Sequence, residues 1–185
     1  MLYITVPTGK CFDEATNEFI YTEEHTLQLE HSLVSLSKWE SKWNKPFLTN
    51  KEKTDEETLD YIRCMTLTPN VDPLVYMALT NAHKKQIIDY IEAPMTATTF
   101  SDGNKTAKGG RLNGEIITSE LIYYWMTALN INYECQYWHL NRLITLIRVC
   151  SVKNQPPGKK KSTREINNQY AAMNAARRKM LNSKG

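Results

Sequence analysis

The sequence lacks any hydrophobic run that approaches the roughly 18 apolar residues of a membrane-spanning helix. Its start also lacks the basic residues of a secretion signal, so we expect no signal peptide. Glycine and proline are scarce, with seven of each in 185 residues, which excludes collagen-like and proline-rich disordered chains. With 41% hydrophobic and 23% charged residues, the composition is typical of a globular domain with a packed core.

Paired cysteines are missing as well. None of Cys11, Cys64, Cys135 and Cys150 belongs to a Cys-x-x-Cys motif, so we expect free thiols in a reducing compartment. Cys135 and His139 are four residues apart on a predicted helix and could supply two metal ligands. A closed zinc site needs four ligands, and no second pair is present. We therefore expect a hydrogen-bonded core or interface histidine, and neither a metal nor a cofactor.

Catalytic signatures do not occur in this sequence. It contains neither Gly-x-Ser-x-Gly nor His-Glu-x-x-His. The loop 105–111 has the glycines and lysines of a phosphate cradle but not the Gly-x-x-x-x-Gly-Lys-Ser/Thr pattern. Several carboxylates crowd the start of one predicted helix, where the helix dipole favours anions; they are Glu52, Asp55, Glu56, Glu57 and Asp60. We expect them to cap that helix, and we expect no enzymatic activity.

The spacing of apolar residues along the sequence changes near residue 30. Apolar residues alternate with polar ones over 2–6 and 26–30, and a shorter apolar run covers 19–21, which predicts a small antiparallel β element in residues 1–30. From Ser32 the apolar spacing becomes helical. Residues 32–152 are therefore predicted to be helical, and the fold class is α+β, mainly α.

Local capping signals mark where these helices begin. Ser32 is a candidate N-cap, Thr54 with Glu57 forms a capping box, and Asp72 precedes a proline at the first helical position. The helix that follows Asp72 is expected to run to Pro94, with a break near residues 80–81. Two strongly apolar segments, 116–129 and 135–152, predict buried helices in an antiparallel hairpin. The glycine-rich loop 101–114 lies before them.

The C-terminal part differs from the body in composition. Two prolines and a glycine in 155–158, followed by three lysines, predict a linker over 153–162. Ser162 and Glu165 form a second capping-box pattern, which opens a basic amphipathic helix in the tail 163–185. The predicted organisation is one α+β body of residues 1–152, a linker and this tail.

Charge is divided unequally along the chain. Residues 153–185 hold nine basic residues and one acidic residue, a net charge of +8. The rest holds 14 basic and 19 acidic residues, a net charge of −5. A basic tail on an acidic body can attract an acidic protein, a nucleic acid or the body itself, and self-association also stays open. Nucleic acid is the less favoured partner, because Tyr170 is the tail's one aromatic residue and no nucleic-acid-binding module signature is present.

Two groups of residues are candidates for binding a partner. Trp39 and Trp43 share a helical face with Leu36, so they either pack in the core or anchor an interface. In the tail, we expect an apolar stripe on one helical face to pack against the surface of a partner. It is formed by Ile166, Tyr170, Met173 and Met180.

Three stretches of the sequence resemble a known family. They are Leu36-Ser-Lys-Trp-Glu-Ser-Lys-Trp43, Tyr61-Ile-Arg-Cys-Met65, and Trp138-His-Leu-Asn-Arg-Leu-Ile-Thr-Leu-Ile-Arg148 followed by an end rich in alanine and arginine. Together they resemble the tail assembly chaperones of tailed bacteriophages. The resemblance implies a mostly helical, non-enzymatic protein of virion morphogenesis in the host bacterial cytoplasm. Its implied partners are the tape-measure protein, which it keeps soluble, and the tail-tube protein. It also implies that a longer, frameshifted product can exist. A phage regulatory or host-interaction protein that acts through the basic tail stays open as an alternative.

Overall fold

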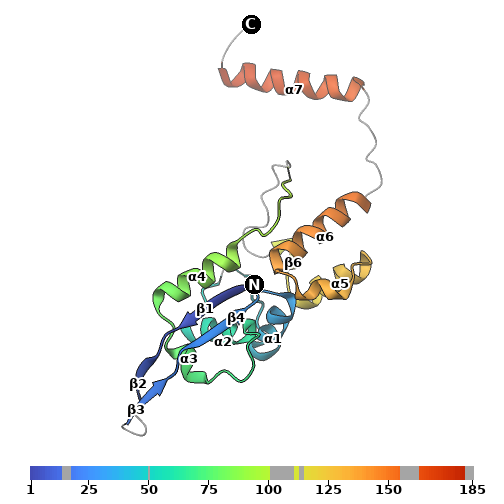
Figure 1. The fold of residues 1–185 in the computed structure, drawn as a ribbon. Helices are drawn as coiled ribbons and strands as arrows, with labels where there is room; N and C mark the ends of the chain where they lie inside the picture. Colours follow the sequence, from blue (N-terminus) through green and yellow to red (C-terminus); the bar gives the residue numbers. More distant parts are fainter. Residues whose placement is uncertain (14–17, 50, 101–110, 113–114, 155–162, 182–185) are drawn as a thin grey trace. The chain divides into compact units, whose positions relative to one another are not determined.

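The computed structural model describes residues 1–13, 18–49, 51–100, 111–112, 115–154 and 163–181 (Figure 1). The chain divides into two compact units, Met1–Cys150 and Ser151–Gly185. The fold is α+β and mainly α, with short antiparallel strand pairs and a majority of helix, as the sequence predicts. Among the described residues, no helix has both the length and the apolar character needed to cross a membrane.

The N-terminal strands form two consecutive antiparallel pairs. β1 (Leu2–Val6) pairs with β4 (His25–Leu29), and β2 (Gly9–Asp13) pairs with β3 (Glu18–Thr22). The sequence predicts β1, β3 and β4 but not β2, since Gly-Lys-Cys-Phe-Asp has no alternation of apolar and polar residues. Backbone pairing with β3, along the full length from Gly9 to Asp13, defines this strand instead.

The second edge of β4 is occupied by the chain that follows helix α2 (Asp55–Met65). The Glu30 amide donates to the Met65 carbonyl over 2.9 Å, and the Leu67 amide donates to the Gln28 carbonyl over 2.8 Å. These bonds hold the end of α2 beside the sheet. The buried face of β1 and β4 packs with α1 (Leu33–Trp43), α2, α3 (Pro73–Met77) and α4 (Asn81–Glu92) in a first core cluster.

The predicted caps are confirmed. The Ser32 hydroxyl accepts from the Ser35 amide at the start of α1, and the Asp72 carboxylate accepts from the Leu74 amide at the start of α3. The predicted break near residues 80–81 is also present, because Thr80 caps α4 as a separate helix. Each of these signals is local, which is why the sequence is sufficient to place them.

The last part of the body differs from its prediction. Both predicted helices are present, as α5 (Ser119–Ala128) and α6 (Leu140–Asn154), but each starts later than predicted. The strand pair β5 (Arg111–Leu112) and β6 (Glu115–Ile116) precedes α5, and the 3-10 helix η1 (Tyr133–Tyr137) precedes α6. Thr118 caps α5, so this helix starts three residues after β6. The expectation of a buried helix is only partly met by α5, because Ile122 and Met126 are fully buried but Tyr124 is 65% exposed.

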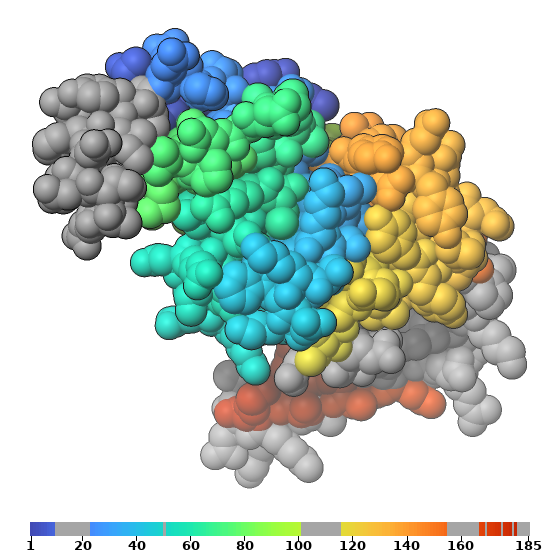
Figure 2. Space-filling model, turned by 90° about the horizontal axis from the view of Figure 1, so that it is seen from below, coloured from blue at the N-terminus to red at the C-terminus, as the bar shows by residue number. Residues whose placement is uncertain are grey.

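α1 lies between the two halves of the body. Its Trp39 belongs to the first core cluster, whereas Leu33 and Leu36 belong to a second cluster with residues of α5, η1 and α6. Figure 2 shows α1 in light blue between the cyan and green segments of α2–α4 and the yellow and orange segments of α5–α6. The core of the body is thus two clusters that share one helix.

The second unit contains helix α7 (Thr163–Leu181), close to the predicted bounds of the tail helix. The predicted capping box of Ser162 and Glu165, the linker prolines and nearly all of loop 101–114 lie outside the described residues or side chains.

Candidate interaction surfaces

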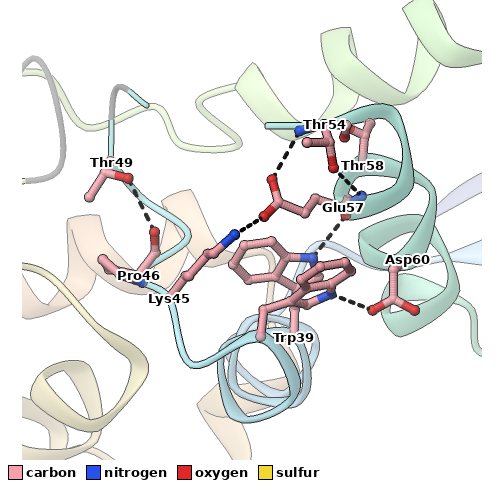
Figure 3. Close-up of polar contacts among 9 residues, drawn as sticks. Trp39, Lys45, Pro46, Thr49, Thr54, Glu57, Thr58 and Asp60 are labelled. Atoms are coloured by element: carbon pink, nitrogen blue, oxygen red, sulfur yellow. Dashed lines mark hydrogen bonds and ion pairs between the residues drawn. The ribbon is translucent and has the colours of Figure 1, made fainter. Parts of the chain in front are cut away.

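Trp39 is a core residue and not a surface anchor. Its side chain is 1% exposed, and its indole Nε1 donates to the Glu57 carbonyl of α2 over 2.8 Å (Figure 3). The ring stacks on Trp43 with 6.0 Å between centroids and meets Phe47 edge-on at 5.0 Å. The interpretation of Trp39 as a partner-binding residue is therefore corrected, because α2 covers the ring.

Trp43 is half-buried, at the end of the same helix. Its Nε1 donates to Asp60 Oδ2 over 2.9 Å, and Asp60 also pairs with Lys42. Burial alone would raise the pKa of Asp60, but the hydrogen bonds from Lys42 and Trp43 outweigh burial and lower it. The polar edge of Trp43 thus serves to hold α1 against α2, which leaves only part of its ring for any partner.

Of the five carboxylates predicted to cap α2, Glu57 has that role, whereas Asp60 bonds to Trp43 and Lys42. The Thr54 hydroxyl accepts from the Glu57 amide over 3.1 Å, and Glu57 Oε2 accepts from the Thr54 amide over 2.9 Å (Figure 3). A hydrogen bond from Lys45, 2.5 Å from Glu57 Oε1, is the main reason that the pKa of Glu57 is lowered. The Glu57 carboxylate is therefore used in helix capping and in the ion pair with Lys45, whereas Glu52, Asp55 and Glu56 are exposed.

Cys135 and His139 do not share a helix. Cys135 lies in η1, and His139 precedes α6 with its Nε2 3.0 Å from the Tyr90 carbonyl oxygen. The prediction of a hydrogen-bonded core histidine is confirmed. In the part of the chain that the structure describes, no cluster of three or more histidine, cysteine or carboxylate side chains is arranged to hold a metal.

A buried polar network, which the sequence does not predict, joins the residues just after β4 to α2, α4 and the residue before α6. His31 Nδ1 lies 2.6 Å from the Tyr61 hydroxyl, and its ring meets that of His139 edge-on at 5.1 Å. Beside it, the Tyr90 hydroxyl donates to Glu30 Oε1 over 2.8 Å. Burial, with a smaller contribution from His139, lowers the pKa of His31 to about 3.

Every buried side-chain nitrogen and oxygen among the described residues has a hydrogen-bond partner. The network of His31, Glu30, Tyr61, Tyr90 and His139 is therefore bonded within the protein. Groups held in this way are typical of a satisfied core, in which removing one partner is costly.

The predicted stripe of the tail is exposed where its side chains are described. Tyr170 is 60%, Met173 44% and Met180 82% exposed. These residues are three and seven positions apart, spacings that place side chains on one face of a helix. Ile166 is part of α7, but its side chain lies outside the described set.

A second exposed group, which the sequence analysis missed, lies on α5 and η1. We define the tyrosine surface as Tyr123, Tyr124, Tyr133 and Tyr137. Tyr123 and Tyr133 stack with 6.4 Å between ring centroids, and the Tyr133 hydroxyl lies 2.6 Å from Thr127 Oγ1. Burial and the nearby phenols of Tyr137 and Tyr133 raise the pKa of Tyr123. The sequence signal that could have revealed this surface is the high density of aromatic residues, since six fall within 123–138.

Comparison with models of known protein families, with curated proteins and with solved structures finds no match to this chain.

Proposed function

We propose that this protein is a non-enzymatic assembly chaperone of a tailed bacteriophage, which binds the tape-measure protein and helps to recruit tail-tube subunits. The resemblance of three sequence stretches to such chaperones supports the choice of client. The observation that carries the proposal is helix α7, a 19-residue helix in the second unit with exposed tyrosine and methionine side chains.

The residues on α7 suit an apolar helical client. Tyr170 offers a large ring with few rotatable bonds, while Met173 and Met180 are flexible and polarisable, so they adapt to irregular apolar surfaces. An amphipathic helix with its apolar residues on one face docks by laying that face against a groove or another helix. A chaperone that binds along a long helical client needs this kind of apolar surface.

The charge on α7 supports capture of an acidic client. Arg177 and Arg178 are exposed near Met180, within a segment of net charge +8. Rim charges of this kind increase association rates through long-range attraction more than they increase final affinity. The apolar residues therefore contribute most of the affinity, and the arginines mainly increase the association rate.

The test is co-expression of the full chain with the tape-measure protein of the same genome, measuring the soluble fraction of that client. We expect the triple variant Tyr170→Ser, Met173→Ser, Met180→Ser to lose most of the solubilising effect, because it removes the apolar face. The matched control changes three exposed residues of the same helix, Asn167, Asn168 and Asn174, to alanine and should retain the effect. A client that is equally soluble without the protein contradicts the proposal.

The alternative is nucleic-acid binding through the basic tail. The observation that favours it is the exposure of Lys153, Arg177 and Arg178 within the net +8 segment. Such binding would be independent of sequence and would weaken steeply with salt, since each neutralised phosphate releases counterions. Absent or salt-insensitive binding of duplex DNA and single-stranded RNA by the full chain would exclude it.

A further inference from the structure

The segment 112–141, which carries the tyrosine surface, has a net negative charge. From 112 to 141 the sequence contains no lysine or arginine, but it contains Glu115, Glu120 and Glu134. Glu120 and Glu134 are exposed. Glu120 lies one helical turn before Tyr124, so both belong to one face of α5, and Glu134 is next to Tyr133 in η1. Exposed phenol rings and carboxylates are thus combined in one segment.

Side-chain contacts join α5 to η1 within the tyrosine surface. Tyr124 and Thr127 are three residues apart on α5, and Thr127 contacts the Tyr133 hydroxyl of η1. The Tyr123 hydroxyl donates to Gln136 Oε1 over 2.9 Å, which fixes α5 against η1. Tyr124 and Tyr137, by contrast, are 65% and 63% exposed. Tyr123 and Tyr133 are therefore hydrogen-bonded within the protein, whereas the rings of Tyr124 and Tyr137 are accessible to a partner.

Aromatic faces and carboxylates both attract cations. The negative face of an aromatic ring binds a guanidinium or ammonium group, and a nearby carboxylate adds Coulomb attraction. The protein already uses this contact next to the surface, where the Arg142 guanidinium lies 4.1 Å from the centre of the Trp138 ring. The same chemistry disfavours nucleic acid here, because carboxylates repel phosphates.

We propose that the tyrosine surface binds an arginine- or lysine-bearing segment of a partner protein. Tyr124 and Tyr137 each offer an exposed ring to a cationic side chain, and Glu120 and Glu134 add Coulomb attraction. This surface is independent of α7 and of the client proposed above. The protein then has two binding surfaces of opposite charge, a basic one on α7 and an acidic aromatic one on the body.

The test measures binding of a fluorescent oligo-arginine peptide to the full chain by anisotropy. The comparison peptide replaces each arginine with citrulline, a neutral isostere. We expect the Tyr124→Ala, Tyr137→Ala variant to bind the arginine peptide about 4- to 25-fold more weakly, because each exposed cation–π contact is worth about a factor of two to five. Glu134→Gln should weaken binding and reduce its salt dependence.

Two control variants keep the proposal open to refutation. Tyr3→Ala, Met77→Ala removes two side chains of comparable exposure elsewhere on the body, 62% and 63%, and should leave the affinity unchanged. Tyr124→Phe, Tyr137→Phe keeps both rings and should bind as the unmodified chain does. Equal binding of the citrulline peptide, or an equal loss in the Tyr3, Met77 control, would overturn the proposal. The protein could instead self-associate in a concentration-dependent way that requires both residues 155–185 and this surface. That result would show that the surface binds the tail of a second copy, and it would overturn the assignment to another protein.

Discussion

At the scale of single residues, buried charge holds the body together. Glu40 of α1 is 7% exposed, and its two carboxylate oxygens accept from the Phe47 amide over 2.8 Å and from the Ser119 amide over 2.7 Å. One side chain thus fixes the chain after α1 and the start of α5. Hydrogen bonds that include a charged group contribute more than neutral ones, so this carboxylate helps to determine where the second half of the body packs.

His31 gives the protein a pH dependence whose sign follows from its burial. The pKa of His31 is lowered to about 3 in the folded chain, whereas an unfolded histidine titrates near 6.5. The unfolded chain therefore binds more protons between these values. We expect the free energy of unfolding to be highest above pH 6.5 and to fall as the pH decreases, by at most about 1.4 kcal/mol per pH unit from this residue.

Urea unfolding of the full chain and of His31→Asn, at several pH values between 6.5 and 4, isolates this contribution. The asparagine amide can still reach the Tyr61 hydroxyl but does not titrate. We expect this variant to be less stable above pH 6.5 and to have a flatter pH dependence, because it lacks the imidazole that gains a proton on unfolding. Identical slopes for the two proteins would show that His31 is not buried in its neutral form.

At the scale of secondary-structure elements, one asparagine joins the end of a helix to the start of another. Asn141 at the start of α6 donates through Nδ2 to the carbonyls of Ile91 and Ala93, each over 2.9 Å, at the end of α4. Asn132 has the opposite polarity, because its Oδ1 accepts from the Glu134 amide and caps η1. The same residue type is therefore a donor in one place and an acceptor in the other.

This difference makes a matched pair of substitutions. Asn141→Asp removes the donor and places a negative charge beside the carbonyl end of α4, so we expect it to lower the free energy of unfolding by about 1–3 kcal/mol. Asn132→Asp keeps the accepting oxygen, and aspartate is an equally good N-cap, so stability should change little. Chemical denaturation near neutral pH measures both variants, and equal effects would contradict the assigned bonds.

At the scale of the whole molecule, the body and the tail differ in what stabilises them. Both core clusters lie inside Met1–Cys150 and share helix α1, whereas the described side chains of α7 are exposed. Most of the stability of a helix in a protein comes from packing of its apolar face, so a helix with exposed side chains adds little to the body. We infer that the body folds without help from the tail.

Deleting residues 159–185 should therefore shift the melting temperature of the body by less than about 2 °C, which corresponds to less than about 1 kcal/mol for a chain of this size. Leu36→Ala serves as the sensitivity control. Leu36 is fully buried in the second cluster, so its truncation should cost about 2–5 kcal/mol. A deletion that destabilises the body as much as this control would show that the tail belongs to the core.

The sequence by itself determined the α+β class and where α1, α2, α3 and α4 begin, because caps such as Ser32 and Thr54 act within one turn of their own helix. Only the tertiary structure decided which aromatic residues are accessible. Trp39 and Tyr124 both lie on helices with apolar neighbours, yet α2 covers Trp39 and leaves Tyr124 65% exposed. Periodicity shows that a helix has an apolar face, but contacts between residues far apart in sequence determine which of its rings are buried.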